Sequence, residues 1–477
     1  MVKNINEFHT LLIDKKITIT DLVNHYLENI KNKNTEINAY REVFDDALSI
    51  AKEYDKQLEN KTSDEIKEFL KTKKLFGVPV ALKDNILIKG KRAGASSKVL
   101  ENYIASYDST VVKKLRDQGA IFLGRTNMDE FAMGGSTENS AYGVTKNPLN
   151  LEYVAGGSSG GSAAVISSDM SLVSLGSDTG GSIRQPASYN GIYALKPTYG
   201  SVSRHGLMAM ASSFDVIGPF AKDMDDVCKV FDIIKGVDEL DSTTHDVNMI
   251  FSAKDKLRVG IPREFIFTDG VSDEVKKSIE NTIERLKQKG VEVVDISIPL
   301  LKESLAIYYI LVPAEVSSNM SRYDGIRYGK NIDTKNGIED YLQTRGQLLG
   351  PEVKRRIILG TYILSAGYHD AYYKKAGILR ENLRQDIKNK LKDVDVIMTP
   401  TTPDTSFKIG EKITNTLSLY LADIFTVTAN LVGMPAISVP YKDDKGENST
   451  ANDLPLGIQL MADTDKEDTL FSIAKML

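Results

Sequence analysis

Cysteine is nearly absent from this chain, which has one cysteine, Cys228, among 477 residues. A single cysteine excludes a disulfide framework within the chain and any metal cluster built on several cysteines. Such cysteine usage is typical of proteins in a reducing compartment. The sequence therefore predicts a cytoplasmic protein.

The chain also lacks an excess of positive charge and long apolar segments. Its 60 Lys and Arg residues against 65 Asp and Glu residues give a formal net charge of −5, which argues against a general nucleic-acid-binding protein. The longest uncharged apolar stretch, LAIYYILVPA, covers about half of the ~20 residues that a membrane helix needs. The N-terminal MVKNINEFHT has no apolar signal region. Neither export nor a membrane span is predicted.

No Pro-rich, Gln-rich or repeated tract divides the chain, so we expect a single domain over residues 1–477. Hydrophobic residues make up 41% of it and charged residues 26%, which is enough to bury a large core. Residues 1–72 are expected to form an N-terminal helical layer. In TITDLVNHYLENI, Leu22, Tyr26 and Leu27 share one helix face behind a Thr20 or Asp21 cap.

Helix and strand patterns alternate beyond this layer. LFGVPVALKDNI predicts a buried strand that ends at Lys83. DSTVVKKLRDQGAIFLGRTN predicts a helix that stops at Gly119 and is followed by a strand. The same order recurs after residue 272, where a helical stripe ends at Gly290 and a strand is expected over 291–298; the stripe comprises Val275, Ile279, Ile283 and Leu286. This alternation indicates an α/β sheet.

A Gly/Ser-rich stretch runs from Gly156 to Ser182, with seven Gly and nine Ser residues. Its apolar interruptions predict two loops joined by buried structure. In the first loop, GGSSG matches the G-x-S-x-G pattern with Ser158 at the nucleophile position, although tight turns or an anion-binding nest fit the glycines equally well. Neither a P-loop nor a G-x-G-x-x-G motif is present, so a nucleotide site is not predicted.

The second loop, SDTGGSIRQPAS, has the composition of an oxyanion hole. Gly180 and Gly181 would let a substrate carbonyl approach the backbone without meeting a Cβ atom. The consecutive N–H groups of Thr179, Gly180, Gly181 and Ser182 could then stabilise a developing oxyanion, an effect of ~3 to 4 kcal/mol per donor. Ser182 is the predicted nucleophile.

A serine nucleophile needs a base, and two candidates stand out. His205 is the only one of the five histidines near the Gly/Ser stretch, so a Ser-His-Asp triad would have to use it. Lys83 ends an apolar strand, where desolvation would favour the neutral amine, although a solvated lysine at a strand end is the ordinary alternative. Cys228 lies in a helical pattern one turn before Phe231 and is interpreted as core packing.

The stretches GVPVALKDNI, GGSSGGSAA, SLGSDTGGSIRQPAS and LKPTYGSVSRHGL together strongly resemble the amidase signature family. The resemblance implies a Ser-Ser-Lys triad of Lys83, Ser158 and Ser182, with Ser158 on a cis peptide bond after Gly157. It also implies the α/β amidase signature fold, a large mixed central β-sheet covered by helices, with the signature core at about 73–220.

Within that family, NMDEFAMGGSTENSAYGVTKNP, SRYDGIRYG and EVKRRIILGTYILSAGYHDAYYKKA resemble the A subunits of tRNA-dependent amidotransferases. The resemblance implies a glutaminase that passes ammonia to the B and C subunits of a heterotrimer. These partners amidate Glu-tRNA(Gln), or in some organisms Asp-tRNA(Asn), with the tRNA bound mainly by the B subunit. No cofactor or metal is implied in this chain, whereas ATP and Mg²⁺ would belong to the B subunit.

The same resemblance implies a glutamine site. Arg356, or alternatively Arg355, would bind the α-carboxylate, Asp423 would bind the ammonium group, and Tyr309 would line the pocket. Asp423 also has a helix-cap interpretation. A stand-alone amidase for small amides and an inactive scaffold remain alternative functions. Tyr372, Tyr373 and nearby lysines could contact tRNA, but packing and solvated charge are the ordinary interpretation.

Overall fold

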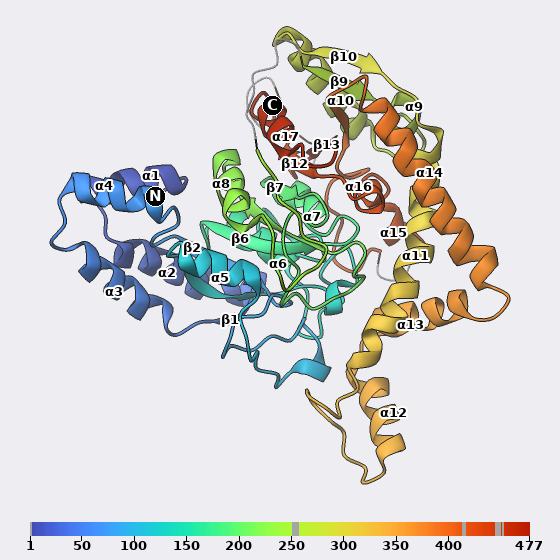
Figure 1. Cartoon of the computed structure of the whole chain (residues 1–477), viewed down its shortest axis with the longest axis horizontal. Coiled ribbons are helices and arrows are strands. Elements are labelled where there is room, and N and C mark those ends of the chain that lie inside the picture. The colour runs from blue at the N-terminus through green and yellow to red at the C-terminus, as the bar shows by residue number, and fades with distance from the viewer. Residues whose placement is uncertain (1, 250–256, 413–415, 444–449, 451–452) are drawn as a thin grey trace.

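A computed structural model describes residues 2–249, 257–412, 416–443, 450 and 453–477 (Figure 1). Within them, eleven strands form one sheet in the order β1-β3-β2-β6-β8-β7-β12-β13-β11-β9-β10. The strands of this sheet are β1 (Tyr40–Val43), β2 (Pro79–Lys83), β3 (Ile121–Thr126), β6 (Val173–Asp178), β7 (Tyr193–Lys196), β8 (Val216–Ala221), β9 (Arg258–Ile261), β10 (Glu292–Asp295), β11 (Val396–Pro400), β12 (Ala436–Pro440) and β13 (Gly457–Ala462). A separate pair joins β4 (Lys146–Asn147) to β5 (Asn150–Val154).

The large sheet is mixed, as predicted. β2 runs parallel to both β3 and β6, and β9 runs parallel to β10 and β11. The strands between these two parallel groups pair antiparallel. Every residue of β2, β3 and β6 is buried, which fits strands covered on both faces. Lys83, the last residue of β2, therefore ends inside the protein.

Helices surround this sheet. The N-terminal helices α1–α4 lie together at one end of the molecule, and α11–α14 lie at the other end (Figure 1). The helices are α1 (Ile5–Ile13), α2 (Ile19–Ile37), α3 (Ala47–Leu58), α4 (Ser63–Thr72), α5 (Thr110–Asp117), α6 (Gly160–Ser167), α7 (Arg184–Asn190), α8 (Met224–Ile234), α9 (Arg263–Ile266), α10 (Asp273–Gln288), α11 (Ser304–Asn319), α12 (Gly337–Leu348), α13 (Pro351–Leu364), α14 (Lys375–Lys390), α15 (Thr416–Leu421), α16 (Val427–Val432) and α17 (Glu467–Ala474). None of those described has both the length and the apolar character needed to cross a membrane.

The predicted N-terminal helical layer consists of the four helices α1–α4, and it also contains one strand that was not predicted. β1 pairs antiparallel with β3 and forms an edge of the sheet. The predicted cap of α2 was wrong, because Thr18 is the N-cap and forms a capping box with Asp21. Leu22 and Tyr26 are buried as predicted, whereas Leu27 is half-buried.

The two predicted helix–strand units are present. α5 precedes Gly119, which has a φ of +85°, and β3 follows it. All four predicted apolar positions of α10 are buried, and Gly290 has a φ of +82°. β10 is shorter than the predicted strand because it is an edge strand whose pairing with β9 covers four residues.

The buried structure predicted between the two Gly/Ser loops consists of α6 and β6. The first loop leads directly into α6, and the second connects β6 to α7. Both loops therefore lie next to the end of β2, which pairs with β6. This arrangement brings the two loops to the Lys83 side chain.

The observed cap of α2 can be tested with two neighbouring threonines. Thr18 Oγ1 accepts the Asp21 N–H at 3.0 Å, so Thr18→Ala should weaken the first turn by about 1 kcal/mol. We expect about fivefold faster hydrogen exchange at the Asp21 amide, measured by NMR or mass spectrometry. Thr20→Ala is the control and should leave that exchange rate unchanged. Equal acceleration in both variants would contradict the cap assignment.

Candidate active site

Lys83 is the centre of the candidate site. Its side chain is fully buried, and its Nζ lies 2.8 Å from Ser158 Oγ, 2.7 Å from Ser159 Oγ and 2.9 Å from Ser177 Oγ. The Ser177 carbonyl oxygen lies at 3.2 Å. Over the described ranges, no carboxylate lies within ion-pair distance of this nitrogen. The amine is therefore surrounded by neutral oxygen atoms.

This environment favours the uncharged amine. Burial lowers the pKa of Lys83 from its ordinary 10.5 to about 7, although the negative charges of Asp129, Asp178 and Asp215 act in the opposite direction. A buried ammonium loses its hydration, and neutral hydroxyl groups replace that hydration only in part. A substantial fraction of Lys83 is consequently able to accept a proton at neutral pH.

The surrounding hydrogen bonds indicate where the amine directs its lone pair. Ser159 Oγ donates its own hydrogen to the Ser177 carbonyl at 3.1 Å, so it accepts from Lys83. Ser177 Oγ accepts from Asn85 Nδ2 at 2.9 Å and can also accept from Lys83. A neutral amine has two hydrogens and one lone pair. With its hydrogens directed to Ser159 and Ser177, the lone pair faces the hydroxyl of Ser158.

Ser158 follows a cis peptide bond between Gly157 and Ser158, as the family resemblance implied. Gly157 packs against the buried carboxylate of Asp129, and a Cβ atom at Gly157 would lie 2.1 Å from Asp129 Oδ2. That carboxylate accepts the N–H groups of Thr137 at 2.9 Å and Asn139 at 3.1 Å. Glycine is therefore required here because any side chain would displace the group that orders residues 137–139.

Asp178 holds the loop that carries Ser182. Its carboxylate accepts the Gly181 N–H at 2.8 Å and the Ile183 N–H at 3.0 Å. Burial alone would raise the pKa of Asp178, but the adjacent Arg184 guanidinium holds it at about 2. The carboxylate thus stays charged and fixes the loop on both sides of Ser182.

One member of the predicted oxyanion hole needs correction. The Gly181 N–H is engaged by Asp178, so it is not free to bind an oxyanion. The N–H groups of Thr179, Gly180 and Ser182 donate no hydrogen bond to another described residue. These three remain candidates, and the Gly180 position needs glycine because a Cβ atom would lie 2.4 Å from Tyr308 Oη.

Ser182 lies close to the first loop. The Ser159 N–H donates to the Ser182 carbonyl oxygen at 3.2 Å, and the Ser182 side chain is 9% exposed. In the part of the chain that the structure describes, no hydrogen bond joins the Ser158 and Ser182 hydroxyl groups. The contact between Ser158 and Lys83 that a proton relay would need is therefore in place.

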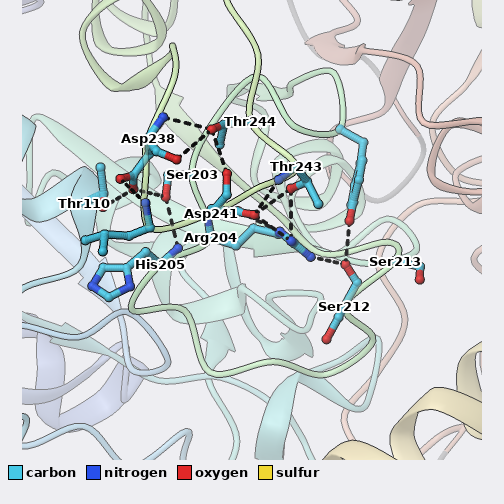
Figure 2. A network of polar contacts seen from close by, with 12 residues as sticks. Thr110, Ser203, Arg204, His205, Ser212, Ser213, Asp238, Asp241, Thr243 and Thr244 are labelled. Carbon is cyan, nitrogen blue, oxygen red and sulfur yellow. Dashed lines mark hydrogen bonds and ion pairs between the residues drawn. The ribbon is translucent and has the colours of Figure 1, made fainter.

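Asp215 supports the same loop from the other side. It accepts the Thr179 hydroxyl at 2.7 Å and the Met210 N–H at 2.9 Å, and burial raises its pKa to about 6. Figure 2 shows the neighbouring network, in which Arg204 and Asp241 form a pair with nitrogen–oxygen distances of 2.9 and 3.0 Å. This network anchors the segment that leads to Asp215.

The alternative catalytic groups do not reach Ser182. His205 lies at the border of the Figure 2 network, where its backbone N–H donates to Ser203 Oγ at 3.1 Å. Its ring stacks on Tyr107, with the ring centroids 4.9 Å apart. Cys228 is half-buried, and burial raises the pKa of its thiol to about 11. His205 therefore lacks the geometry of a catalytic base for Ser182, and the raised pKa of Cys228 does not suit a thiolate nucleophile.

The three residues predicted to bind a zwitterion lie together. Arg356 is buried, and its guanidinium carbon is 5.6 Å from the Tyr309 ring centroid. The Tyr309 hydroxyl lies 3.5 Å from Asp423 Oδ2. The side chain of Arg355, by contrast, is 50% exposed. Arg356, and not Arg355, is therefore the arginine that lies with Tyr309 and Asp423.

Two further residues contact this cluster. Glu352 Oε1 accepts Arg356 Nε at 2.8 Å and the Tyr420 hydroxyl at 2.9 Å. The Tyr420 and Tyr309 rings stack with centroids 3.9 Å apart. Neither Glu352 nor Tyr420 was predicted, although the Glu352–Arg356 spacing of four residues on α13 is a recognisable ion-pair pattern.

The cluster of Arg356, Tyr309 and Asp423 adjoins the loop that carries Ser182. The Thr426 hydroxyl donates to the Gly180 carbonyl at 2.7 Å, and the Thr426 N–H donates to the Asp423 carbonyl at 3.0 Å. Asp423 is not a side-chain cap, since α16 begins after Thr426 with no side-chain cap bond. Burial raises the pKa of Asp423 to about 7. An ammonium group bound beside Asp423 would stabilise its charged carboxylate.

The sequence analysis did not predict four further residues of the site, which are Ser159, Ser177, Asn85 and Asp215. The many serines between residues 156 and 182 indicated the segment that contacts Lys83, but they did not indicate which hydroxyl groups face its side chain. The described residues include no group of three or more His, Cys, Asp or Glu side chains arranged to hold a metal ion.

Comparisons with known proteins agree with this geometry. Residues 21–471 match the family model described as Amidase. The chain is 45% identical to the glutamyl-tRNA(Gln) amidotransferase A subunit 2 of Clostridium acetobutylicum, over 99% of this chain and 98% of that protein. It is also 45% identical to the glutamyl-tRNA(Gln) amidotransferase A subunit of Sulfurihydrogenibium sp., over 99% of this chain and 96% of that protein.

A solved structure has the same fold. The crystal structure of the glutamyl-tRNA(Gln) amidotransferase A subunit from Thermotoga maritima matches with a TM-score of 0.76 and 38% identity. The match covers 97% of this chain and 94% of that chain. The mixed eleven-stranded sheet is thus the fold of a known group of enzymes.

The state of Lys83 can be tested with a neutral fluorophosphonate. Its phosphorus forms a bond to Ser182 Oγ as fluoride leaves, and the serine proton passes toward Lys83. Lysine accepts a proton only when neutral, so the labelling rate should rise with pH, with its midpoint at about 7. Mass spectrometry would follow the labelled peptide.

Two variants define the outcome of this labelling experiment. Lys83→Met should slow labelling by about 10²- to 10⁴-fold, and Ser182→Ala should abolish it. Lys74→Met, at a half-exposed surface lysine, is the control and should label like the unaltered chain. Labelling that is independent of pH and survives Lys83→Met would refute Lys83 as the base.

Proposed function

Because the chain belongs to the amidase family, we propose that it hydrolyses glutamine with Lys83, Ser158 and Ser182 and donates the ammonia within a tRNA-dependent amidotransferase. The observation that carries the proposal is the fully buried Lys83, whose Nζ lies 2.8 Å from Ser158 Oγ. Its pKa of about 7 suits a group that takes up and returns a proton at neutral pH.

In the first half of the reaction, Ser182 Oγ attacks the carboxamide carbon of glutamine. The Ser182 proton passes to Ser158, whose own proton moves to neutral Lys83. The carbonyl oxygen becomes an oxyanion that the N–H groups of Thr179, Gly180 and Ser182 stabilise. Lys83 is then an ammonium ion, and Ser182 is bonded to the tetrahedral carbon.

The intermediate collapses when its carbon–nitrogen bond breaks. Lys83 returns its proton through Ser158 to the leaving nitrogen, which departs as ammonia and leaves a glutamyl ester on Ser182. Water attacks this ester with the same relay as base. Glutamate is released, and the Ser182 hydroxyl is restored. These steps require no cofactor in this chain.

The pocket chemistry favours glutamine over a simple amide. Arg356 supplies a buried cation for the α-carboxylate, and Asp423 supplies a carboxylate for the ammonium group. A guanidinium binds a carboxylate through two parallel hydrogen bonds. An amidase for small aliphatic or aryl amides would instead favour an apolar pocket. Opposed charges are therefore the feature that distinguishes the two functions.

The relatives named above are A subunits, and on that basis we propose the B and C subunits as partners. The B subunit would hold ATP and Mg²⁺, bind Glu-tRNA(Gln) or Asp-tRNA(Asn), and use the ammonia. The assembly would operate in the cytoplasm. We also propose that residues 1–477 form a single domain, because the large sheet takes strands from Tyr40 to Ala462.

Glutamine turnover tests the proposed reaction. The chain should release glutamate from glutamine in the presence of the B and C subunits and Glu-tRNA(Gln). Lys83→Met should lower kcat by at least about 10²-fold, because methionine fills similar space but accepts no proton. An enzyme-coupled glutamate assay measures the rate, and circular dichroism verifies the fold. Rapid hydrolysis of unrelated amides by the chain alone would favour the small-amide function.

Arg356 and its neighbour Arg355 provide a matched test of substrate binding. Arg356→Lys should raise the KM for glutamine by about 10- to 100-fold, because the two-point carboxylate contact is lost. Arg355→Lys should leave KM nearly unchanged, since that side chain is 50% exposed. Hydrolysis of a neutral amide without an α-carboxylate should be insensitive to both. A larger effect at Arg355 would reverse the assignment.

A further inference from the structure

A second side chain from the end of β2 reaches a hydroxyl group that Lys83 contacts. Asn85 follows Lys83 by two residues and is 2% exposed. Its Nδ2 donates to Ser177 Oγ at 2.9 Å, and Lys83 Nζ lies 2.9 Å from the same oxygen. The Ser177 hydroxyl therefore joins the Asn85 amide to the Lys83 amine.

The backbone that carries Asn85 is held on both sides. The Asn85 carbonyl oxygen accepts the Met208 N–H at 2.9 Å. The Ile86 N–H donates to the Lys83 carbonyl at 2.9 Å and closes a turn at the end of β2. These two hydrogen bonds fix the point from which the Asn85 side chain extends toward Ser177.

The orientation of the Asn85 amide leaves one of its atoms without a partner. Asn85 Oδ1 is buried and accepts no hydrogen bond from the residues that the structure describes. Such an atom destabilises a folded protein, so its presence needs a reason other than stability. The same orientation directs the N–H group, which is the positive end of the amide dipole, at the hydroxyl that Lys83 contacts.

We propose that Asn85 is a positioning residue that acts through Ser177 to keep Lys83 in its neutral, proton-accepting form, an inference that rests on the role of Lys83 in the proposed function. Hydrogen bonds to an ammonium ion favour the charged amine, and a hydroxyl oxygen that already accepts an N–H group has less electron density to offer it. The positive end of the amide dipole also opposes a positive charge on the amine. Asn85 thus adds to the effect of burial.

The charges around Lys83 act against its neutral form. The buried carboxylates whose negative charges favour the ammonium ion are those of Asp129, Asp178 and Asp215. Asp178 pairs with Arg184, and Asp84, which is next to Lys83 in sequence, pairs with Arg125 at 2.6 Å. An amide at position 85 adds a neutral donor to this set, whereas a carboxylate there would add another charge that favours the ammonium ion.

The pH dependence of Ser182 labelling by the neutral fluorophosphonate tests this proposal on the full chain. Asn85→Asp places a carboxylate beside Ser177. It should raise the midpoint of the labelling profile by about one pH unit or more, which slows labelling about fivefold at pH 7. Asn85→Leu removes the amide dipole from a side chain of similar size and should raise the midpoint by a smaller amount. Mass spectrometry of the Ser182 peptide measures both rates.

The high-pH limit of the profile separates positioning from damage to the fold. Where the profile levels off, both variants should label as fast as the unaltered chain, because Lys83 is then neutral whichever residue follows it at position 85. The thermal midpoint of Asn85→Leu should lie close to that of the unaltered chain, since the lost hydrogen bond is offset by removal of the unpartnered oxygen. Labelling that is slowed by one factor at every pH would show a purely structural role and overturn the proposal.

Asn281→Asp is the matched control for the added charge. Asn281 lies on α10, which packs against β10 and β11, and its Nδ2 donates to the Tyr441 hydroxyl at 2.9 Å. This variant should leave the labelling midpoint unchanged. An equal shift in Asn281→Asp and Asn85→Asp would reveal a general effect of charge and contradict a specific role for Asn85.

The outcomes separate this inference from the proposed function. If labelling of the unaltered chain does not depend on pH, Lys83 is not the base, and the proposed function fails together with the role of Asn85. If the unaltered profile has its midpoint at about 7 and both Asn85 variants keep that midpoint, only the role of Asn85 is wrong.

Discussion

The need to keep one buried lysine uncharged determines much of the structure around it. Among the residues that the structure describes, the partners of Lys83 are hydroxyl and carbonyl groups, and its low pKa depends on the lack of a direct carboxylate contact there. Three buried aspartates nevertheless lie close enough to raise that pKa. Asp178 is paired with Arg184, whereas Asp129 and Asp215 are bonded to backbone N–H groups. Each carboxylate is thus occupied with holding a loop and is unavailable to the amine.

Arg184 connects Asp178, and with it the loop that carries Ser182, to the C-terminal part of the chain. It is fully buried, and besides Asp178 it donates to the Thr426 carbonyl at 2.8 Å, Gln459 Oε1 at 2.6 Å and Asn430 Oδ1 at 2.6 Å. Removing any of these acceptors would leave part of a buried cation without a partner, which is costly. The loop that carries Ser182 therefore relies, through Arg184, on Gln459, which is 275 positions further along the chain. Residues 73–220 do not hold the geometry of this loop alone.

Sequence patterns predicted the parts of this molecule that depend on local periodicity. The strand ending at Lys83, helix α5 and the buried stripe of α10 follow from spacing within one segment. β1 was missed because it has four residues between helices and pairs at an edge. The triad came from a family resemblance. The engagement of the Gly181 N–H by Asp178 was not predictable, because it depends on how a loop folds back on its own strand.

Helix α13 carries one buried arginine, Arg356, and one exposed arginine, Arg355, and this has a physical consequence. Glu352 is shared between buried Arg356 and exposed Arg355. A partner carboxylate that pairs with Arg355 would draw that cation away from Glu352, leaving Glu352 to interact more strongly with Arg356. The orientation of the Arg356 guanidinium would then depend on whether a carboxylate is bound at Arg355. A helix fixed by the close Gly360–Pro313 approach can transmit such a change through its side chains without moving its backbone.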